Sequence, residues 1–306
     1  MEKDSLPLAH HPFVGFIEHM IQESEHGVIR SRILALLEVS AICTIVILLF
    51  KGHMNLPSLA KWQSSVLGQP FIRSIACLVV FPLFVIKLTK LDSSLRSPSR
   101  SDFFRSCLIG LIPMMVLFPA GSAFWLLQIL NFSWLSWRGA VILTVAYGIA
   151  LPFVALILRG RPSVTDYGLH ARDLAMFAGL LLAAILLSSV TLRTCPMIGK
   201  VLYSFLFVGI AEELLARGYF QTRLNNAFGR PFRFLGIQFG WGLIMASGLF
   251  GLMHYFSPGN AFHIPWAMWV TTSSLIFGMV REKGGSFIAS GITHGAMLLP
   301  KVLFAG

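Results

Sequence analysis

The stretch AEELLAR at positions 211–217 places two carboxylates and a guanidinium near the end of an apolar run from Met197 to Ala216. A helix of about 20 apolar residues is long enough to cross a bilayer. Each charge inside such a helix costs roughly 2.5–3.5 kcal/mol on insertion scales, which a simple membrane anchor has no reason to carry. We therefore expect this helix to hold the functional residues, and the other helices to surround it.

The composition is typical of a polytopic helical membrane protein. Hydrophobic residues make up 56% of the chain and charged residues 12%, which excludes an ordinary soluble domain. The apolar residues form long blocks, whereas a transmembrane β-barrel would show short alternating segments. We predict an all-α polytopic membrane protein with about eight to nine transmembrane helices around an intramembrane polar site. The lipid bilayer is then its first partner.

The net charge of +11 does not indicate nucleic acid binding, because the basic residues lie mostly between the apolar blocks. Lys and Arg in short loops orient membrane proteins with those loops inside the cell. A Ser- and Pro-containing loop at 87–105 is the most basic of these segments. We predict a multi-pass integral membrane protein whose amino terminus and 87–105 loop are cytoplasmic.

The chain divides into three parts. Residues 1–32 form a polar amino-terminal segment, residues 33–173 contain four expected spans and the basic 87–105 loop, and residues 174–306 contain the remaining five expected spans. The expected spans are about Ile33–Phe50, Ser74–Leu88, Cys107–Leu130, Ala140–Leu158, Leu174–Leu192, Met197–Ala216, Phe234–Phe256, Pro265–Val280 and Ser286–Phe304. The four cysteines lie within or beside these blocks without a CxxC pair, so they indicate neither a disulfide framework nor a zinc cluster.

Spacing separates the roles of the two adjacent glutamates. Glu213 and Arg217 are four residues apart, so they share one helix face and can bond. Glu212 lies about 140° away from Arg217 around the same helix. Arg217 is thus expected to neutralise Glu213, and Glu212 suits a general base in a poorly solvated site. The competing interpretation is that both acids pair with basic groups at the cytoplasmic boundary.

Two further spans bring imidazoles into the apolar part of the chain. One ends with Phe250 and His254 on a shared face, and the last contains His294. Each histidine alone would more often be a satisfied core residue than a catalyst. Together with the carboxylates they predict a wet polar pocket inside the bilayer. The chain has no GxSxG, HExxH, P-loop or dinucleotide motif, which leaves activation of water, with or without a metal, as the chemistry.

These motifs resemble the CAAX-protease and bacteriocin-processing (CPBP) family of intramembrane proteases, which includes the type II CAAX prenyl endopeptidases. The family is marked by EExxxR, then FxxxH, then HxxxN/D. The corresponding residues are Glu212 to Arg217, Phe250 to His254, and His294. The resemblance covers roughly Leu174–Gly306 and implies a CPBP-like protease core at 174–306.

The resemblance implies hydrolysis of a peptide bond in a membrane-associated peptide or protein, with or without a prenyl group. Glu212 would activate the water, His254 would help to hold it, and His294 would belong to the pocket that steadies the oxyanion. Glu213, Arg217 and Phe250 would support these residues. The motif does not settle whether a metal takes part, and Glu212, His254 and His294 would also suit zinc.

Position 298 departs from the family pattern, because Leu298 stands where Asn or Asp is expected. An asparagine amide could donate to a developing oxyanion, and such a donor is worth on the order of 3–4 kcal/mol. Either Asn260 or Ser290 replaces it, or the enzyme is weak or inactive. The second hypothesis is therefore a membrane scaffold or immunity protein on the same fold.

A third hypothesis is a proton-coupled transporter. Glu38 lies inside the first span, where a lone carboxylate is a functional candidate, and prolines and a glycine interrupt the third span. No inverted repeat is visible in the sequence, so this hypothesis ranks last.

Overall fold

The computed structural model describes a helical protein. The residues that it describes are 12–48, 79–80, 82–84, 97–98, 100–117, 130–159, 164–165, 179, 183, 195–255, 263–297 and 299. Most of expected spans two and five, most of the 87–105 loop, and the residues Asn260 and Leu298 lie outside them.

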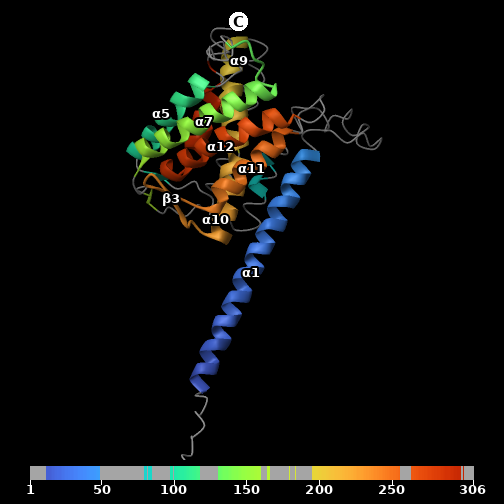
Figure 1. The fold of residues 1–306 in the computed structure, drawn as a ribbon, viewed down its shortest axis with the longest axis vertical. Coiled ribbons are helices and arrows are strands. Elements are labelled where there is room, and N and C mark those ends of the chain that lie inside the picture. The colour runs from blue at the N-terminus through green and yellow to red at the C-terminus, as the bar shows by residue number, and fades with distance from the viewer. Residues whose placement is uncertain are drawn as a thin grey trace, which may run out of the picture.

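Helices dominate the described residues, which confirms the predicted helical fold. In chain order they are α1 (Pro12–Val46), α5 (Arg100–Leu117), α7 (Trp137–Leu158), α9 (Pro196–Tyr203), η3 (Ser204–Ala211), η4 (Leu214–Gln221), α10 (Thr222–Phe228), α11 (Trp241–Tyr255), α12 (Ile264–Gly284) and α13 (Phe287–Ala296). Most of them form one bundle, while α1 runs beside it and extends well beyond it (Figure 1). Within the bundle, α12 contacts α5, α7, α11 and α13.

Among the described residues, two short antiparallel strand pairs accompany the helices. β1 (Ser97–Pro98) pairs with β2 (Val164–Thr165), and β3 (Phe232–Phe234) pairs with β4 (Ile237–Phe239). The β1–β2 pair joins the segment before α5 to the segment after α7. These two helix ends therefore lie at the same end of the bundle.

The apolar run at Ala140–Leu158 forms α7, as predicted. Ser136 caps its first turn by accepting a bond from the Gly139 amide at 3.1 Å, which satisfies an amide that the helix itself leaves without a partner. Among the described residues, α7 is the helix whose length and composition would let it cross a membrane. The total of eight to nine spans stays a prediction.

The expected start of the seventh span at Phe234 is wrong. The β3–β4 turn occupies that position, and α11 begins only at Trp241. Leu235 and Gly236 both have positive φ, at 48° and 90°, as the two central residues of a tight type I′ hairpin turn require. Local turn chemistry at a glycine therefore overrides the apolar pattern that favoured a continuous helix.

A glycine allows α13 to pack closely against the helix that carries the glutamates. A Cβ added at Gly295 would lie 2.6 Å from the Phe205 Cα in η3, closer than side chains tolerate. Only glycine permits this backbone approach. It brings the last described helix, with His294, against the chain that leads to Glu213.

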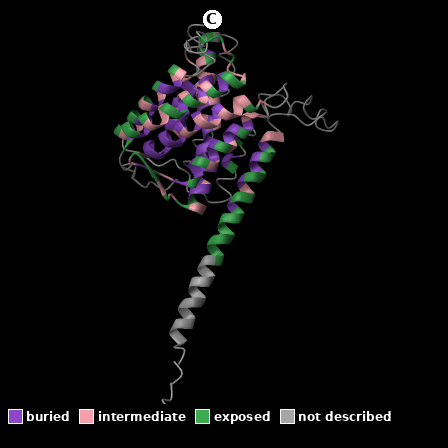
Figure 2. Cartoon of the chain, viewed as in Figure 1, coloured by how far each residue is buried: buried purple, intermediate pink, exposed green. Residues whose placement is uncertain are grey.

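The interior of the bundle contains charged as well as apolar side chains, and it is shown in purple in Figure 2. The buried charged residues are Glu213, Arg217, Arg281, Glu282 and Lys283. Buried charges are costly unless they are paired and hydrogen-bonded. Their partners therefore indicate where the polar site lies.

Candidate active site

Glu212 and Glu213 lie between two π-helical segments. η3 ends at Ala211 and η4 begins at Leu214, so the two glutamates occupy the junction. π-helical turns are rare and occur frequently at functional sites. Glu213 is fully buried, whereas Glu212 is half-buried and its charge acts on the phenol of Tyr203.

Glu213 connects two distant parts of the chain. Its Oε2 accepts a bond from Arg217 Nε at 3.0 Å, and its Oε1 lies 3.1 Å from His294 Nδ1. A carboxylate can only accept, so His294 donates through Nδ1. This bond fixes the orientation of the His294 ring and leaves Nε2 as the nitrogen that can contact a substrate.

Arg217 is held by groups from three helical segments. Its guanidinium donates to Gln221 Oε1 and to Ser247 Oγ, each at 3.2 Å. It also donates to the Ser274 carbonyl at 2.7 Å and to the Ser274 hydroxyl. The i,i+4 bond to Glu213 expected from the sequence is present, and the bonds to α11 and α12 lock the arginine in place.

The rings of both histidines contact the ring of Phe250. The Phe250 ring lies 4.6 Å from the His254 ring and 5.7 Å from the His294 ring, between ring centroids. Phe277 stacks on His294 at 4.6 Å, and Trp266 meets His254 edge-on at 5.2 Å. Phe250 is thus the side chain through which both imidazoles are packed.

His254 also has a defined tautomer. Its Nδ1 lies 2.8 Å from the carbonyl oxygen of Phe250, one helical turn earlier. A carbonyl accepts but cannot donate, so Nδ1 carries the proton. In the neutral form of such a ring, Nε2 is the acceptor nitrogen.

Among the described residues, no three His, Cys, Asp or Glu side chains are close enough together to hold a metal ion. Glu212, His254 and His294 therefore do not form a preassembled metal centre. Zinc ligands must approach to about 2.0–2.2 Å, whereas groups that share a water can stand farther apart.

Of the two suggested replacements for the missing asparagine, Ser290 lies in the described part of the chain. It is fully buried, and its hydroxyl donates to the Phe287 carbonyl at 2.8 Å. A hydroxyl has one proton to donate. Ser290 therefore uses that proton within its own helix in this arrangement.

The sequence analysis missed a second buried carboxylate, Glu282, near the end of α12. Glu282 Oε1 accepts from Gln221 at 2.8 Å, from Asn225 at 2.7 Å and from Arg281 at 3.1 Å. Its Oε2 accepts from Arg230 Nε at 3.2 Å.

The balance of these contacts sets the protonation of Glu282. Burial alone would raise its pKa, but Arg281 and Arg230, followed by the two amides, bring the pKa below its ordinary value. The run Arg281-Glu282-Lys283 looks like an exposed loop in the sequence. The one feature of the sequence that suggested burial was the position of the acid between two basic residues, which can pair with it.

Glu38, the basis of the transporter hypothesis, has structural partners. It accepts a bond from the Tyr219 hydroxyl and one from Arg223 Nε at 2.9 Å. These contacts attach α1 to η4 and α10. The carboxylate in the first span is therefore accounted for by helix packing.

Comparison with known proteins points to one family. A model described as type II CAAX prenyl endopeptidase Rce1-like matches residues 194–299. Searches of curated proteins and of solved structures found no match. The matched segment contains both glutamates, Arg217 and both histidines. Residues 194–299 are therefore similar to the Rce1-like family of membrane-integral type II CAAX prenyl endopeptidases, which confirms the resemblance predicted from the sequence.

Proposed function

We propose that this protein is an intramembrane endopeptidase that hydrolyses a peptide bond in a membrane-associated substrate. The observation that carries the proposal is the buried bond between Glu213 and His294. It sets an oriented imidazole beside the helix junction that presents Glu212. The family match over the same residues supports the reaction class.

In the proposed reaction, Glu212 accepts a proton from water as the water oxygen attacks the carbonyl carbon of the substrate. His254 accepts a bond from the same water through Nε2. His294 contributes to the pocket that steadies the negative oxygen of the tetrahedral intermediate. The carbon–nitrogen bond then breaks, and Glu212 returns the proton to the leaving amine.

The hydrogen bonds of Glu213 and Arg217 offset the free-energy cost of burying their charges. Glu213 is neutralised by Arg217, and Arg217 is fully hydrogen-bonded to η4, α11 and α12. The catalytic groups thus stand on a rigid, satisfied support, as precise positioning requires. A substrate would enter as an extended chain, because the peptide bonds of a helix are already shielded by their own hydrogen bonds.

A second candidate function is a catalytically weak or inactive membrane scaffold or immunity protein. Leu298 favours it, because leucine cannot donate to an oxyanion. The two candidates differ in what Leu298→Asn does. A gain in proteolysis supports a weakened enzyme, whereas no proteolysis in either form supports a scaffold.

The test is cleavage of a peptide with a carboxyl-terminal CAAX sequence by the full chain in liposomes, with and without a farnesyl group on its cysteine. Glu212→Gln should lower the turnover by about 10²–10⁴-fold, the range expected for loss of a general base. Glu38→Gln is the control, since it removes a carboxylate that lies outside the site. Full turnover in Glu212→Gln would remove Glu212 from this role. A preference for the farnesylated peptide would define the substrate class.

A further inference from the structure

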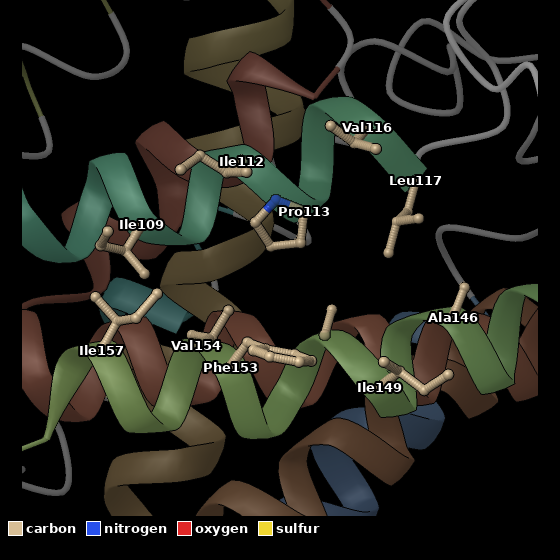
Figure 3. A pocket seen from close by; sticks show the side chains of 11 residues that line it. Ile109, Ile112, Pro113, Val116, Leu117, Ala146, Ile149, Phe153, Val154 and Ile157 are labelled. Carbon is tan, nitrogen blue, oxygen red and sulfur yellow. The ribbon is translucent and has the colours of Figure 1, made fainter.

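An apolar groove lies between α5 and α7, and none of its lining residues belongs to the candidate active site. It has a volume of about 320 Å³, within the lower range of ligand pockets, ~300–1,000 Å³. Figure 3 shows side chains of the two helices facing each other across it. Its lining includes Ile109, Val116 and Leu117 of α5 and Ile149, Phe153 and Ile157 of α7.

The surroundings of the groove indicate contact with lipid. α7 has the length and composition of a membrane span, and exposed apolar side chains continue past the groove on both helices, including Leu108 and Val145. No lining side chain offers a hydrogen bond. A peptide backbone would leave its polar groups unsatisfied there, whereas a hydrocarbon chain has none to satisfy.

One end of the groove is cationic. Arg105 lies one turn before Ile109, and its Nη2 donates to the Ile157 carbonyl at 2.5 Å. Arg105 is exposed, and so is Arg159, which follows the last residue of α7. The nearby carboxylate of Asp102 is bound by Lys283 at 3.0 Å. Counting the described residues at this end, Arg105 and Arg159 leave a positive charge.

Together these features match an amphiphile with an apolar tail and an anionic head. We propose that the α5–α7 groove binds an anionic phospholipid, with one acyl chain along the groove and the phosphate against Arg105 and Arg159. This site is independent of the proposed peptidase reaction. Its charge complementarity favours an anionic phospholipid over a zwitterionic one with the same chains.

Native mass spectrometry of the full chain, released from mild detergent, tests the site with added phosphatidylglycerol or phosphatidylcholine of identical acyl chains. Phosphatidylglycerol should be retained more tightly. Arg105→Gln should weaken its retention by about fivefold, the effect of removing one basic side chain beside an anionic headgroup. Arg138→Gln, at the opposite end of α7, is the matched control and should change nothing.

A second pair of variants tests the groove itself. Val116→Trp would fill it from an exposed position, and Leu108→Trp places the same ring on the same helix outside the groove. Val116→Trp should reduce retention of both lipids, whereas Leu108→Trp should leave it unchanged. Equal retention of the two lipids by the unaltered chain would overturn the proposal. The proposal would also be overturned if Arg105→Gln and Arg138→Gln, or Val116→Trp and Leu108→Trp, reduced lipid retention equally.

Discussion

Two buried carboxylates, Glu213 and Glu282, lie at opposite ends of one chain of hydrogen bonds but have different partners. Gln221 links them: its Oε1 accepts from Arg217, the partner of Glu213, and its Nε2 donates to Glu282. Glu282 is bound by Arg230, Arg281 and two amides. Glu213 is bound by Arg217 and by an imidazole.

The difference lies in what the partners can do. The partners of Glu282 are permanently charged guanidiniums or neutral amides, so that region can only hold helices together. The region of Glu213 includes His294, whose second ring nitrogen can contact a reacting group. Both carboxylates are buried, but Glu282 holds helices together, whereas Glu213 positions a histidine.

The largest expected effect follows from removing the arginine of the Glu213 region. Arg217→Met should lower the free energy of unfolding by about 3–5 kcal/mol, because Glu213 would remain buried without its cation. Denaturant unfolding of the purified protein in micelles measures this. Arg223→Met is the control: it breaks a partly exposed pair with Glu38 and should cost about 1 kcal/mol or less. Similar losses in both variants would contradict the buried pairing.

A direct comparison of the two carboxylates comes next. Glu213→Gln should lower peptidase turnover by about 10–100-fold, by analogy with the carboxylates that orient metal-bound histidines. Glu282→Gln should leave turnover within about twofold, since it touches no group of the reaction. Both are measured with the liposome assay. If Glu282→Gln were the more damaging to turnover, the assignment of the two regions would be reversed.

The acid sensitivity of the Glu282 region should be smaller but specific. Folding lowers the pKa of the Glu282 carboxyl. Its contribution to stability is therefore complete above its pKa in the unfolded chain, about 4.5, and is lost as the pH falls through its lower pKa in the folded chain. Stability of the unaltered chain should therefore fall below about pH 4.5. Glu282→Gln should flatten this fall in unfolding curves measured at several pH values. An identical pH dependence would show that Glu282 is not the responsible acid.

The smallest effect is expected at Glu38, outside both regions. Glu38→Gln should change the free energy of unfolding by about 1 kcal/mol or less, because its pair with Arg223 is partly exposed. It should also leave turnover unaltered. Proton uptake by liposomes containing the chain, abolished by this substitution, would instead revive the transporter hypothesis.

Local spacing made part of the site predictable. The Glu213–Arg217 bond lies within one helix, where residues four apart meet whatever the rest of the fold does. The same holds for Phe250 and His254. The apolar run at Ala140–Leu158 predicted α7 through its length and composition, which are also local properties. The predicted helix at Phe234 failed because a two-residue turn, Leu235 and Gly236, outweighs an apolar pattern.

The sequence by itself determined the helical class, the family resemblance and the candidate residues, since composition and short-range spacing carry that information. Only the tertiary structure decided that His294 is held by Glu213, and that Arg281-Glu282-Lys283 is buried. Both depend on which helices pack together: the close approach allowed by Gly295 brings His294 to Glu213, and α12 brings Glu282 to Gln221 and Asn225. Partners so far apart in the chain are chosen by packing geometry, which no local pattern of residues encodes.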